Sequence, residues 1–287
     1  MTCNYISRFF PASFSVFPFS PLLAIFTSMK LKIYLEYDGT RYSGWQKQPG
    51  QADTKTVQGT LIKVLKKIFA ETKGNAKFID LQGSGRTDAG VHALEQVAHL
   101  ECETMIAPEI LKLKINDELS SDINILEIEK APNNFHARHS AKSRQYLYVI
   151  SKRRTAFEKR YVWWIKDNLD VKKMKDAAAM FIGMHDFKSF SEKSNEDKTT
   201  KCLIEKLEVT EDEGKIYIRI KASHFLWKMV RRIVGVLVEV GRGKMTKEDI
   251  LPAFLPSPLR RGAGGEVNEP ARYTAPPSGL FLEKIYY

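Results

Sequence analysis

The N-terminal half of the chain carries apolar residues in two different periods. Leu31, Ile33, Leu35 and Tyr37 recur at every second position, which is typical of a half-buried strand. After Thr56, a plausible helix N-cap, apolar residues recur at helical spacing instead, at Val57, Leu61, Val64, Leu65 and Ile68. These patterns predict strands at 31–37, 77–84, 95–102 and 123–131 and helices at 57–71 and 107–120.

The C-terminal half repeats this rhythm. Ile216, Ile218 and Ile220 alternate cleanly, and the broadest apolar helical face of the chain runs from Phe225 to Val238. A helix over 225–243 is therefore expected, and Thr246 with Asp249 resembles a capping box for a short helix after it. The remaining patterns predict a helix at 170–183, capped by Asp170, and strands at 144–151, 203–211, 215–222 and 280–287.

Strand–helix–strand–strand–helix–strand, met twice, predicts an α+β fold. We expect two tandem ferredoxin-like units that form a mixed, mainly antiparallel sheet with helices packed on one face. The halves share no evident sequence identity, so the prediction rests on rhythm alone. The units are expected at 29–138 and 139–287.

Two stretches stand apart from this pattern. Residues 1–28 are rich in Phe, Pro and Ser and contain no acid, and three prolines interrupt their apolar run. We expect a disordered N-terminal extension, with a weak signal peptide as the alternative. Residues 256–268 are rich in Pro and Gly and predict a flexible insertion. No segment reaches the roughly 20 apolar residues that span a bilayer, and no membrane partner is expected. A membrane-anchored basic protein is a further alternative that rests on residues 1–28 alone.

The net charge of +11 predicts a polyanionic partner. From His136 to Arg160 there are eight Lys or Arg residues and one acid, with tyrosines between them. From Arg219 to Arg232 there are five Lys or Arg residues and no acid, with Phe225 and Trp227 among them. Cations that meet phosphates beside rings that stack on bases favour a nucleic acid, although each stretch alone also suits a solvated charged face.

Cysteine and histidine spacing gives little sign of metal chemistry. Cys3, Cys102 and Cys202 are far apart, which predicts neither a zinc site nor a disulfide framework and fits a reducing, cytoplasmic location. His136 and His139 lie three residues apart without a third ligand nearby. No metal site is expected.

The stretch GSGRTDAGVHA, residues 83–93, is too rich in small residues to favour a helix or strand. It matches neither the dinucleotide-binding nor the P-loop glycine pattern. Ser84, Asp88 and His92 contain the residue types of a hydrolase triad, but no nucleophile elbow surrounds Ser84. A tight turn and a catalytic Asp88 both remain open on this evidence.

Arg231 and Arg232 lie within the most apolar helical stretch. A partly buried arginine requires a carboxylate or phosphate partner. Asp88 is a candidate partner, but the sequence alone does not pair them.

The segment GRTDAGVHA, residues 85–93, resembles the signature of the tRNA pseudouridine synthase A family. Five further segments resemble other blocks of that family in the same order, so that the resemblance spans residues 29–287. They are EYDGTRYSGWQKQP with TVQGTL, FHARHSAKSRQYLYVI, FLWKMVRRIVGVLVEVG and APPSGLFLEKIYY.

The resemblance implies isomerisation of uridine to pseudouridine at positions 38, 39 and 40 of the tRNA anticodon stem-loop, without cofactor or metal. It implies that Asp88 is the nucleophile, that Tyr146 stacks on the uracil, and that Arg231 pairs with Asp88. Arg86 corresponds to the arginine that helps to expel the base and hold phosphate. Further substrate-binding residues are expected at Gln58, Arg138 and Arg232.

The family resemblance also implies a homodimer that binds tRNA across its cleft. The alternative function is a non-catalytic tRNA-binding or RNA-chaperone protein on the same fold. The presence of Asp88 favours the enzyme.

Overall fold

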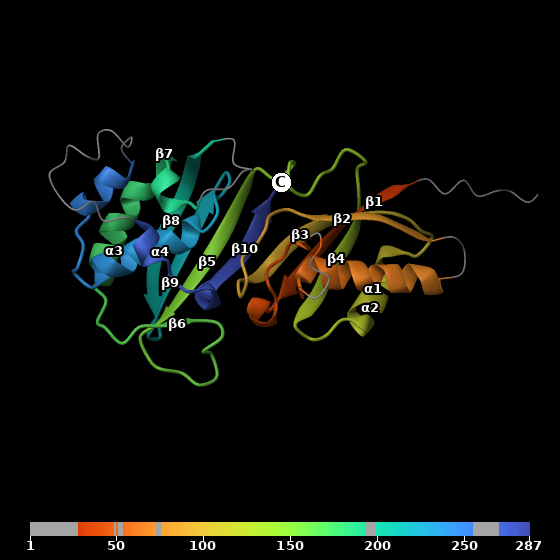
Figure 1. Ribbon diagram of the computed structural model, residues 1–287, viewed down its shortest axis with the longest axis horizontal. Coiled ribbons are helices and arrows are strands. Elements are labelled where there is room, and N and C mark those ends of the chain that lie inside the picture. The colour runs from red at the N-terminus through yellow and green to blue at the C-terminus, as the bar shows by residue number, and fades with distance from the viewer. Residues whose placement is uncertain (1–27, 49, 51–53, 73–75, 193–198, 255–269) are drawn as a thin grey trace, which may run out of the picture.

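The computed structural model describes residues 28–48, 50, 54–72, 76–192, 199–254 and 270–287 (Figure 1). Within them the helices are α1 Val57–Glu71, α2 Pro108–Glu118, α3 Val171–Ala178 and α4 Met229–Gly241. The strands are β1 Met29–Tyr37, β2 Lys77–Gly83, β3 His92–Glu103, β4 Ile123–Ala131, β5 Ser143–Ser151, β6 Trp163–Trp164, β7 Gly183–Asp186, β8 Lys201–Asp212, β9 Lys215–Ala222 and β10 Leu280–Tyr286. The predicted extension 1–28, apart from residue 28, and the insertion 256–268 lie outside the described residues.

All of these strands join one sheet with the order β4-β1-β3-β10-β5-β9-β8-β7, and β2 and β6 pair beside this path with β3 and β5. Each half of the chain repeats one arrangement, β4-β1-β3-β2 in the first and β10-β5-β9-β8 in the second. In both, the first and third strands lie at the centre, which is the strand order of a ferredoxin-like unit. The predicted α+β fold is confirmed.

The two halves meet along one edge of β3. β2 pairs with Ala98–Glu103 of this strand, and β10 pairs in parallel with His92 and Ala93 at its start. The chain that links β2 to β3 therefore leaves the sheet where β2 ends and β10 takes its place. This link is the glycine-rich segment, so the topology puts it at the centre of the molecule.

The helices cover one face of the sheet, α1 and α2 over the first half and α3 and α4 over the second (Figure 1). Their apolar residues join those of the strands in one buried cluster that spans both halves. Thr56 and Asp170 cap α1 and α3 through their side chains, as predicted. None of the described helices has the length and apolar character needed to cross a membrane.

Two predicted helices are shorter than expected. The helix predicted at 170–183 ends at Ala178, and a 3-10 turn and β7 follow, because Gly183 with φ +108° directs the chain into a strand. The helix predicted at 225–243 begins only at Met229, because Lys228 has φ +61° and an α-helix cannot pass through that conformation. The short helix expected after Thr246 is a 3-10 segment, Glu248–Phe254, that contains Pro252.

Candidate active site

Hydrogen bonds hold the first part of the glycine-rich segment, residues 84–87, in place. The Ser84 hydroxyl lies 2.7 Å from Gln96 Oε1, and Gln96 Nε2 donates to the Gly85 carbonyl at 3.1 Å. The Thr87 hydroxyl lies 2.8 Å from the buried Tyr37 hydroxyl. A loop held at this many points presents its side chains in a defined direction without further ordering.

The second part of the segment is a tight turn from Asp88 to Val91. The Val91 amide donates to the Asp88 carbonyl at 3.1 Å, and the Gly90 amide donates to Tyr42. Gly90 has φ +77°, a conformation that strains other residues. Asp88, at the start of this turn, lines a cleft.

The Asp88 carboxylate meets one donor at each oxygen. Arg231 Nη1 lies 3.1 Å from Oδ2, and Trp227 Nε1 donates to Oδ1 at 3.2 Å. The Asp88 side chain keeps 27% of its surface exposed, whereas Arg231 keeps 14%. The carboxylate is therefore oriented on two sides and still open to a ligand.

Two hydrogen bonds to Ala275 hold Arg231 in place. Its Nε donates to the Ala275 carbonyl at 2.7 Å, and the Ala275 amide donates to the Arg231 carbonyl at 3.0 Å. Because α4 begins only at Met229, Arg231 lies in its first turn, where the helix dipole adds positive potential. The left-handed Lys228 before it directs Trp227 toward the cleft; such strain is common at functional sites.

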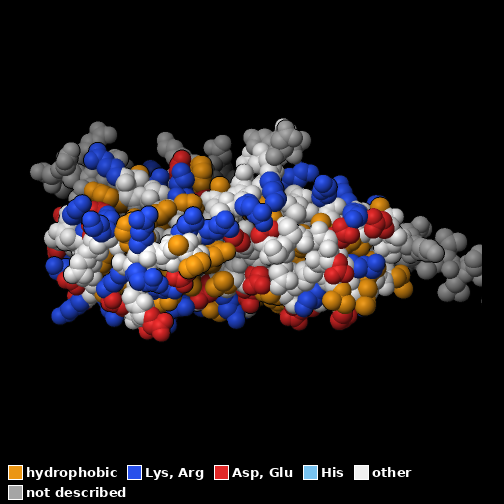
Figure 2. Space-filling model, turned by 90° about the horizontal axis from the view of Figure 1, so that it is seen from below, with side chains coloured by type: hydrophobic (Ala, Val, Ile, Leu, Met, Phe, Trp, Pro, Cys, Tyr) orange, Lys and Arg blue, Asp and Glu red, His pale blue; other side chains and the backbone are white. Residues whose placement is uncertain are grey.

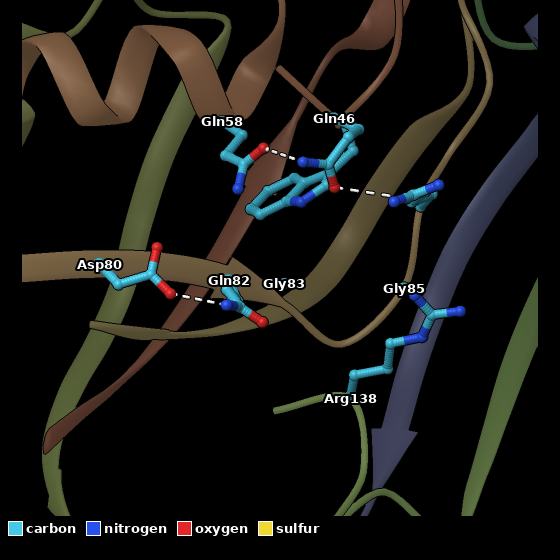
Figure 3. A pocket seen from close by; sticks show the side chains of 9 residues that line it. Gln46, Gln58, Asp80, Gln82, Gly83, Gly85 and Arg138 are labelled. Carbon is cyan, nitrogen blue, oxygen red and sulfur yellow. Dashed lines mark hydrogen bonds between the residues drawn. The ribbon is translucent and has the colours of Figure 1, made fainter. Parts of the chain in front are cut away.

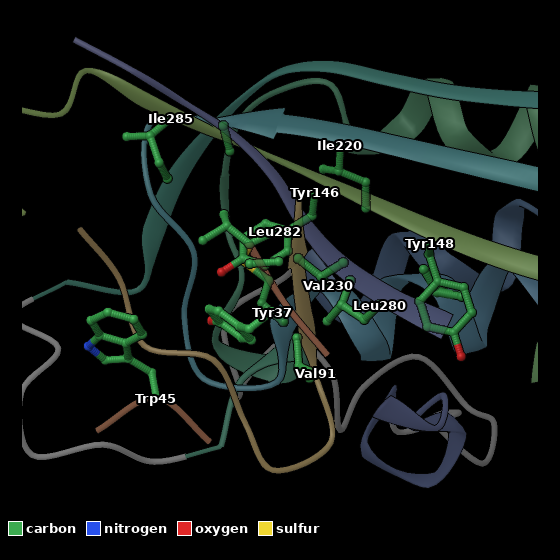
Figure 4. Packing of buried hydrophobic residues seen from close by; sticks show 14 of the residues in the cluster. Tyr37, Trp45, Val91, Tyr146, Tyr148, Ile220, Val230, Leu280, Leu282 and Ile285 are labelled. Carbon is green, nitrogen blue, oxygen red and sulfur yellow. The ribbon is translucent and has the colours of Figure 1, made fainter. Parts of the chain in front are cut away.

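Tyr146 forms the apolar wall of the cleft. It pairs with Leu282 of β10 and Ile220 of β9 and is almost fully buried among their side chains (Figure 4). The Phe225 ring packs edge-on against it at a centroid distance of 5.0 Å. Burial raises the pKa of Tyr146 to about 12, so the phenol is protonated at neutral pH.

This burial predicts alkaline sensitivity of the fold. A tyrosine in the unfolded chain ionises near pH 10, whereas Tyr146 keeps its proton until about pH 12. Between these values the unfolded state binds fewer protons, so the free energy of unfolding should fall by about 1.4 kcal/mol per pH unit for each such tyrosine. Urea unfolding at pH 9 to 11.5 should show a shallower fall for Tyr146→Phe than for Tyr217→Phe, a partly exposed control. Equal slopes would contradict the assignment.

Arg144 lies beneath the cleft and was not singled out from the sequence. Its guanidinium donates to the carbonyls of Ser84 at 2.9 Å, Arg138 at 2.8 Å and Ser223 at 3.2 Å. Burial lowers the pKa of Arg144 below the usual value of an arginine, and its positive charge acts to lower the pKa of Tyr146. Arg144 therefore links the glycine-rich segment around Asp88 (the Asp88 loop) to the connection before β5 and to the end of β9.

Arg86, Gln58 and Arg138 line a smaller hollow beside the cleft, and Arg86 and Arg138 line the cleft as well. Arg86 Nε donates to Gln46 Oε1 at 3.3 Å, and Gln46 Nε2 donates to Gln58 Oε1 at 2.8 Å. Gln58 is buried and also donates to the Leu81 carbonyl, so it positions Gln46 instead of facing the cleft. Gln46 is a further residue that the sequence reasoning missed.

Arg232 does not line the cleft. Its side chain is only 9% exposed and lies 3.7 Å from Glu192, and burial lowers its pKa. The position of its side chain therefore gives no support to the predicted phosphate contact of Arg232. Ser84, Asp88 and His92 do not converge either, because Ser84 is buried against Gln96 and the His92 ring stacks on Phe281. No ligand-like cluster of three or more His, Cys, Asp or Glu occurs in the described part of the chain.

The cleft has a volume of about 1370 Å³ and is strongly cationic. Among the described residues that line it, Asp88 is the single acid, and the Lys and Arg residues are Lys47, Arg86, Arg138, Arg144, Lys228 and Arg231. Figure 2 shows Lys and Arg side chains over both halves of the face that it views, with Asp and Glu between them. These are the features of a site that receives a polyanion and brings it to one carboxylate.

Known proteins are similar in sequence to this chain over most of its length. Residues 33–140 and 177–287 match the family described as tRNA pseudouridine synthase. tRNA pseudouridine synthase A 2 of Clostridium perfringens (strain 13 / Type A) is 38% identical over 259 residues, which cover 90% of this chain and 99% of the relative. tRNA pseudouridine synthase A of Thermoanaerobacter sp. (strain X514) is 40% identical over 257 residues, which cover 89% and 98%. The chain belongs to the tRNA pseudouridine synthase family, a family of isomerases.

Proposed function

We propose that this chain converts uridine to pseudouridine at positions 38, 39 and 40 of the tRNA anticodon stem-loop, with Asp88 as the nucleophile. The observation that carries the proposal is the Asp88 carboxylate, the one acid among the described residues that line the cationic cleft, held between Arg231 and Trp227. The relatives of this chain bear the names tRNA pseudouridine synthase A 2 and tRNA pseudouridine synthase A.

The reaction rearranges one nucleoside, so every atom of the substrate is retained. The target uridine leaves its stack, which costs a few kcal/mol, and enters the cleft. Attack of an Asp88 oxygen on C1′ breaks the C1′–N1 bond, and the bonding pair leaves with the uracil. The detached uracil rotates, and C5 bonds to C1′ as the Asp88 oxygen leaves. Loss of the C5 proton and uptake of a proton at N1 then complete pseudouridine, which has the composition of uridine.

The side chains around Asp88 suit separate steps of this reaction. Arg231 and Trp227 orient the carboxylate, because each donates to one of its two oxygens. Tyr146 supplies a flat apolar wall for the uracil and, as a protonated phenol, a hydrogen-bond donor. Arg86 and Arg138 lie where they can hold phosphates that flank the target.

Incubation of the full chain with an unmodified tRNA transcript that carries uridines at positions 38, 39 and 40 tests the proposal. Pseudouridine is mapped by carbodiimide modification and primer extension. Product at those positions is the expected result. Tight tRNA binding without any product would favour the chaperone function instead. The homodimeric state and the cytoplasmic location stay predictions.

Trp227 should act as a positioning residue. Trp227→Phe removes the N–H donor to Asp88 but keeps an aromatic ring, so kcat should fall about three- to tenfold with little change in KM. Trp227→Ala should also weaken tRNA binding if the ring, which is 45% exposed, stacks on a base. Trp164→Phe is the matched control, because Trp164 is 43% exposed and lies outside the cleft. A Trp227→Phe enzyme with wild-type kcat would refute this role.

A further inference from the structure

A second, smaller hollow opens beside the cleft, at the end of β2 (Figure 3). Its volume is about 310 Å³, the lower end of the range for small-ligand sites. It shares Gln46, Gly85, Arg86 and Arg138 with the cleft, so the two cavities adjoin. An RNA strand whose target uridine occupies the cleft can therefore continue into the hollow.

One end of the hollow carries hydrogen-bond acceptors. Asp80 and Gln82 lie two residues apart on β2 and share one face of the strand. Gln82 Nε2 donates to Asp80 Oδ2 at 2.6 Å, as the dashed line in Figure 3 shows. This bond uses one of the two N–H donors of the Gln82 amide, and Asp80 Oδ1 and Gln82 Oε1 are further acceptors on residues that line the hollow.

The other end of the hollow is cationic. Arg138 enters from the connection before β5, and Arg86 enters from the Asp88 loop. The hydrogen bonds from Gln58 through Gln46 to Arg86 hold this guanidinium at the boundary between the two cavities. A phosphate that joins two consecutive nucleotides meets both arginines when one nucleotide lies in each cavity.

We propose that the hollow binds the nucleotide next to the target uridine on its loop side and prefers a base that carries an amino group. The inference rests on the proposed function of the cleft. A nucleotide has the polarity of the hollow, with an anionic phosphate at one end and the base edge at the other. The amino groups of adenine, cytosine and guanine donate to a carboxylate, whereas a uracil carbonyl facing Asp80 is repelled. For a target at position 38 the loop-side neighbour is an unpaired loop nucleotide, so it enters without the loss of a base pair.

Four synthetic anticodon stem-loops test this subsite. Each carries one target uridine at position 38, and its loop-side neighbour is A, C, G or U. With the full chain at subsaturating RNA, pseudouridine should form about five- to tenfold faster with A, C or G than with U. The same ratio is expected in dissociation constants measured by fluorescence anisotropy with Asp88→Asn.

Variants of Asp80 separate recognition from a general loss of activity. Asp80→Ala should bring the ratio to within about twofold of one, and Asp80→Asn should lower it further, because its amide can donate to a uracil carbonyl. Asp117→Asn, an exposed residue of α2, should keep the wild-type ratio. A wild-type ratio near one, or an unchanged ratio in Asp80→Ala, would overturn the subsite alone. Absence of pseudouridine from all four stem-loops would instead overturn the proposed function.

Discussion

Asp88→Asn should lower the single-turnover rate of pseudouridine formation by at least about a thousandfold. The amide has nearly the size of the carboxylate but cannot attack C1′ as an anion. Its NH₂ group must also face a donor, either Arg231 Nη1 or Trp227 Nε1, which now meet the two carboxylate oxygens. The rate is measured with excess enzyme on the tRNA transcript, and the product is mapped to positions 38, 39 and 40.

The control separates chemistry from binding. The dissociation constant for tRNA should stay within about threefold of wild type or improve, because the Asp88→Asn substitution removes a negative charge from the cationic cleft. Asp176→Asn, an exposed residue of α3, should leave both the rate and the binding unchanged. Product from Asp88→Asn at a rate near that of Asp176→Asn would remove Asp88 from the nucleophile role.

Gly235→Ala should destabilise the fold by about 3 kcal/mol and also reduce activity. Gly235 lies within α4, and a Cβ there would come within 1.3 Å of the Tyr273 carbonyl oxygen. The obstacle is backbone, so α4 and the Pro270–Tyr273 turn must separate. Ala275 follows this turn two residues later and holds Arg231 through two hydrogen bonds, so the contact with Asp88 should weaken as well.

Gly241→Ala provides the comparison within the same helix. A Cβ at Gly241 would lie 2.8 Å from Met174 Sδ and 2.9 Å from its Cγ, so the obstacle is an adaptable side chain and not backbone. Both substitutions gain about 1 kcal/mol of helix propensity, so the difference between them reports the obstacle. Urea unfolding measures both, and Gly241→Ala should stay within about 1 kcal/mol of wild type. Similar stability of the two variants would show that α4 does not need this close approach.

Local patterns predicted most of the secondary structure, because each depends on a few neighbouring residues. The alternation from Leu31 to Tyr37 and the caps at Thr56 and Asp170 appear in the structure where they were expected. The start of α4 was predicted too early because apolar spacing does not report backbone conformation. The apolar pattern begins at Phe225, but the left-handed φ of Lys228 keeps the residues before Met229 out of the helix.

The candidate site was only partly accessible to the same reasoning. The glycine-rich segment drew attention to Asp88, and the family resemblance pointed to Tyr146 and Arg231. Trp227 and Arg144 lie inside segments that the resemblance covers, yet nothing in their spacing shows that one contacts Asp88 and the other supports its loop. Gln46 was missed because its role depends on Gln58 and Arg86 together.

By itself, the sequence determined the α+β class, the repeated strand order and the presence of one acid in a glycine-rich, family-specific segment. Periodicity and motif are properties of consecutive residues, so a single chain displays them before it folds. The tertiary structure alone decided that Arg231 reaches Asp88 across 143 positions while the adjacent Arg232 turns to Glu192. Neighbours on a helix point about 100° apart, and which of them faces the cleft depends on how α4 packs against distant segments.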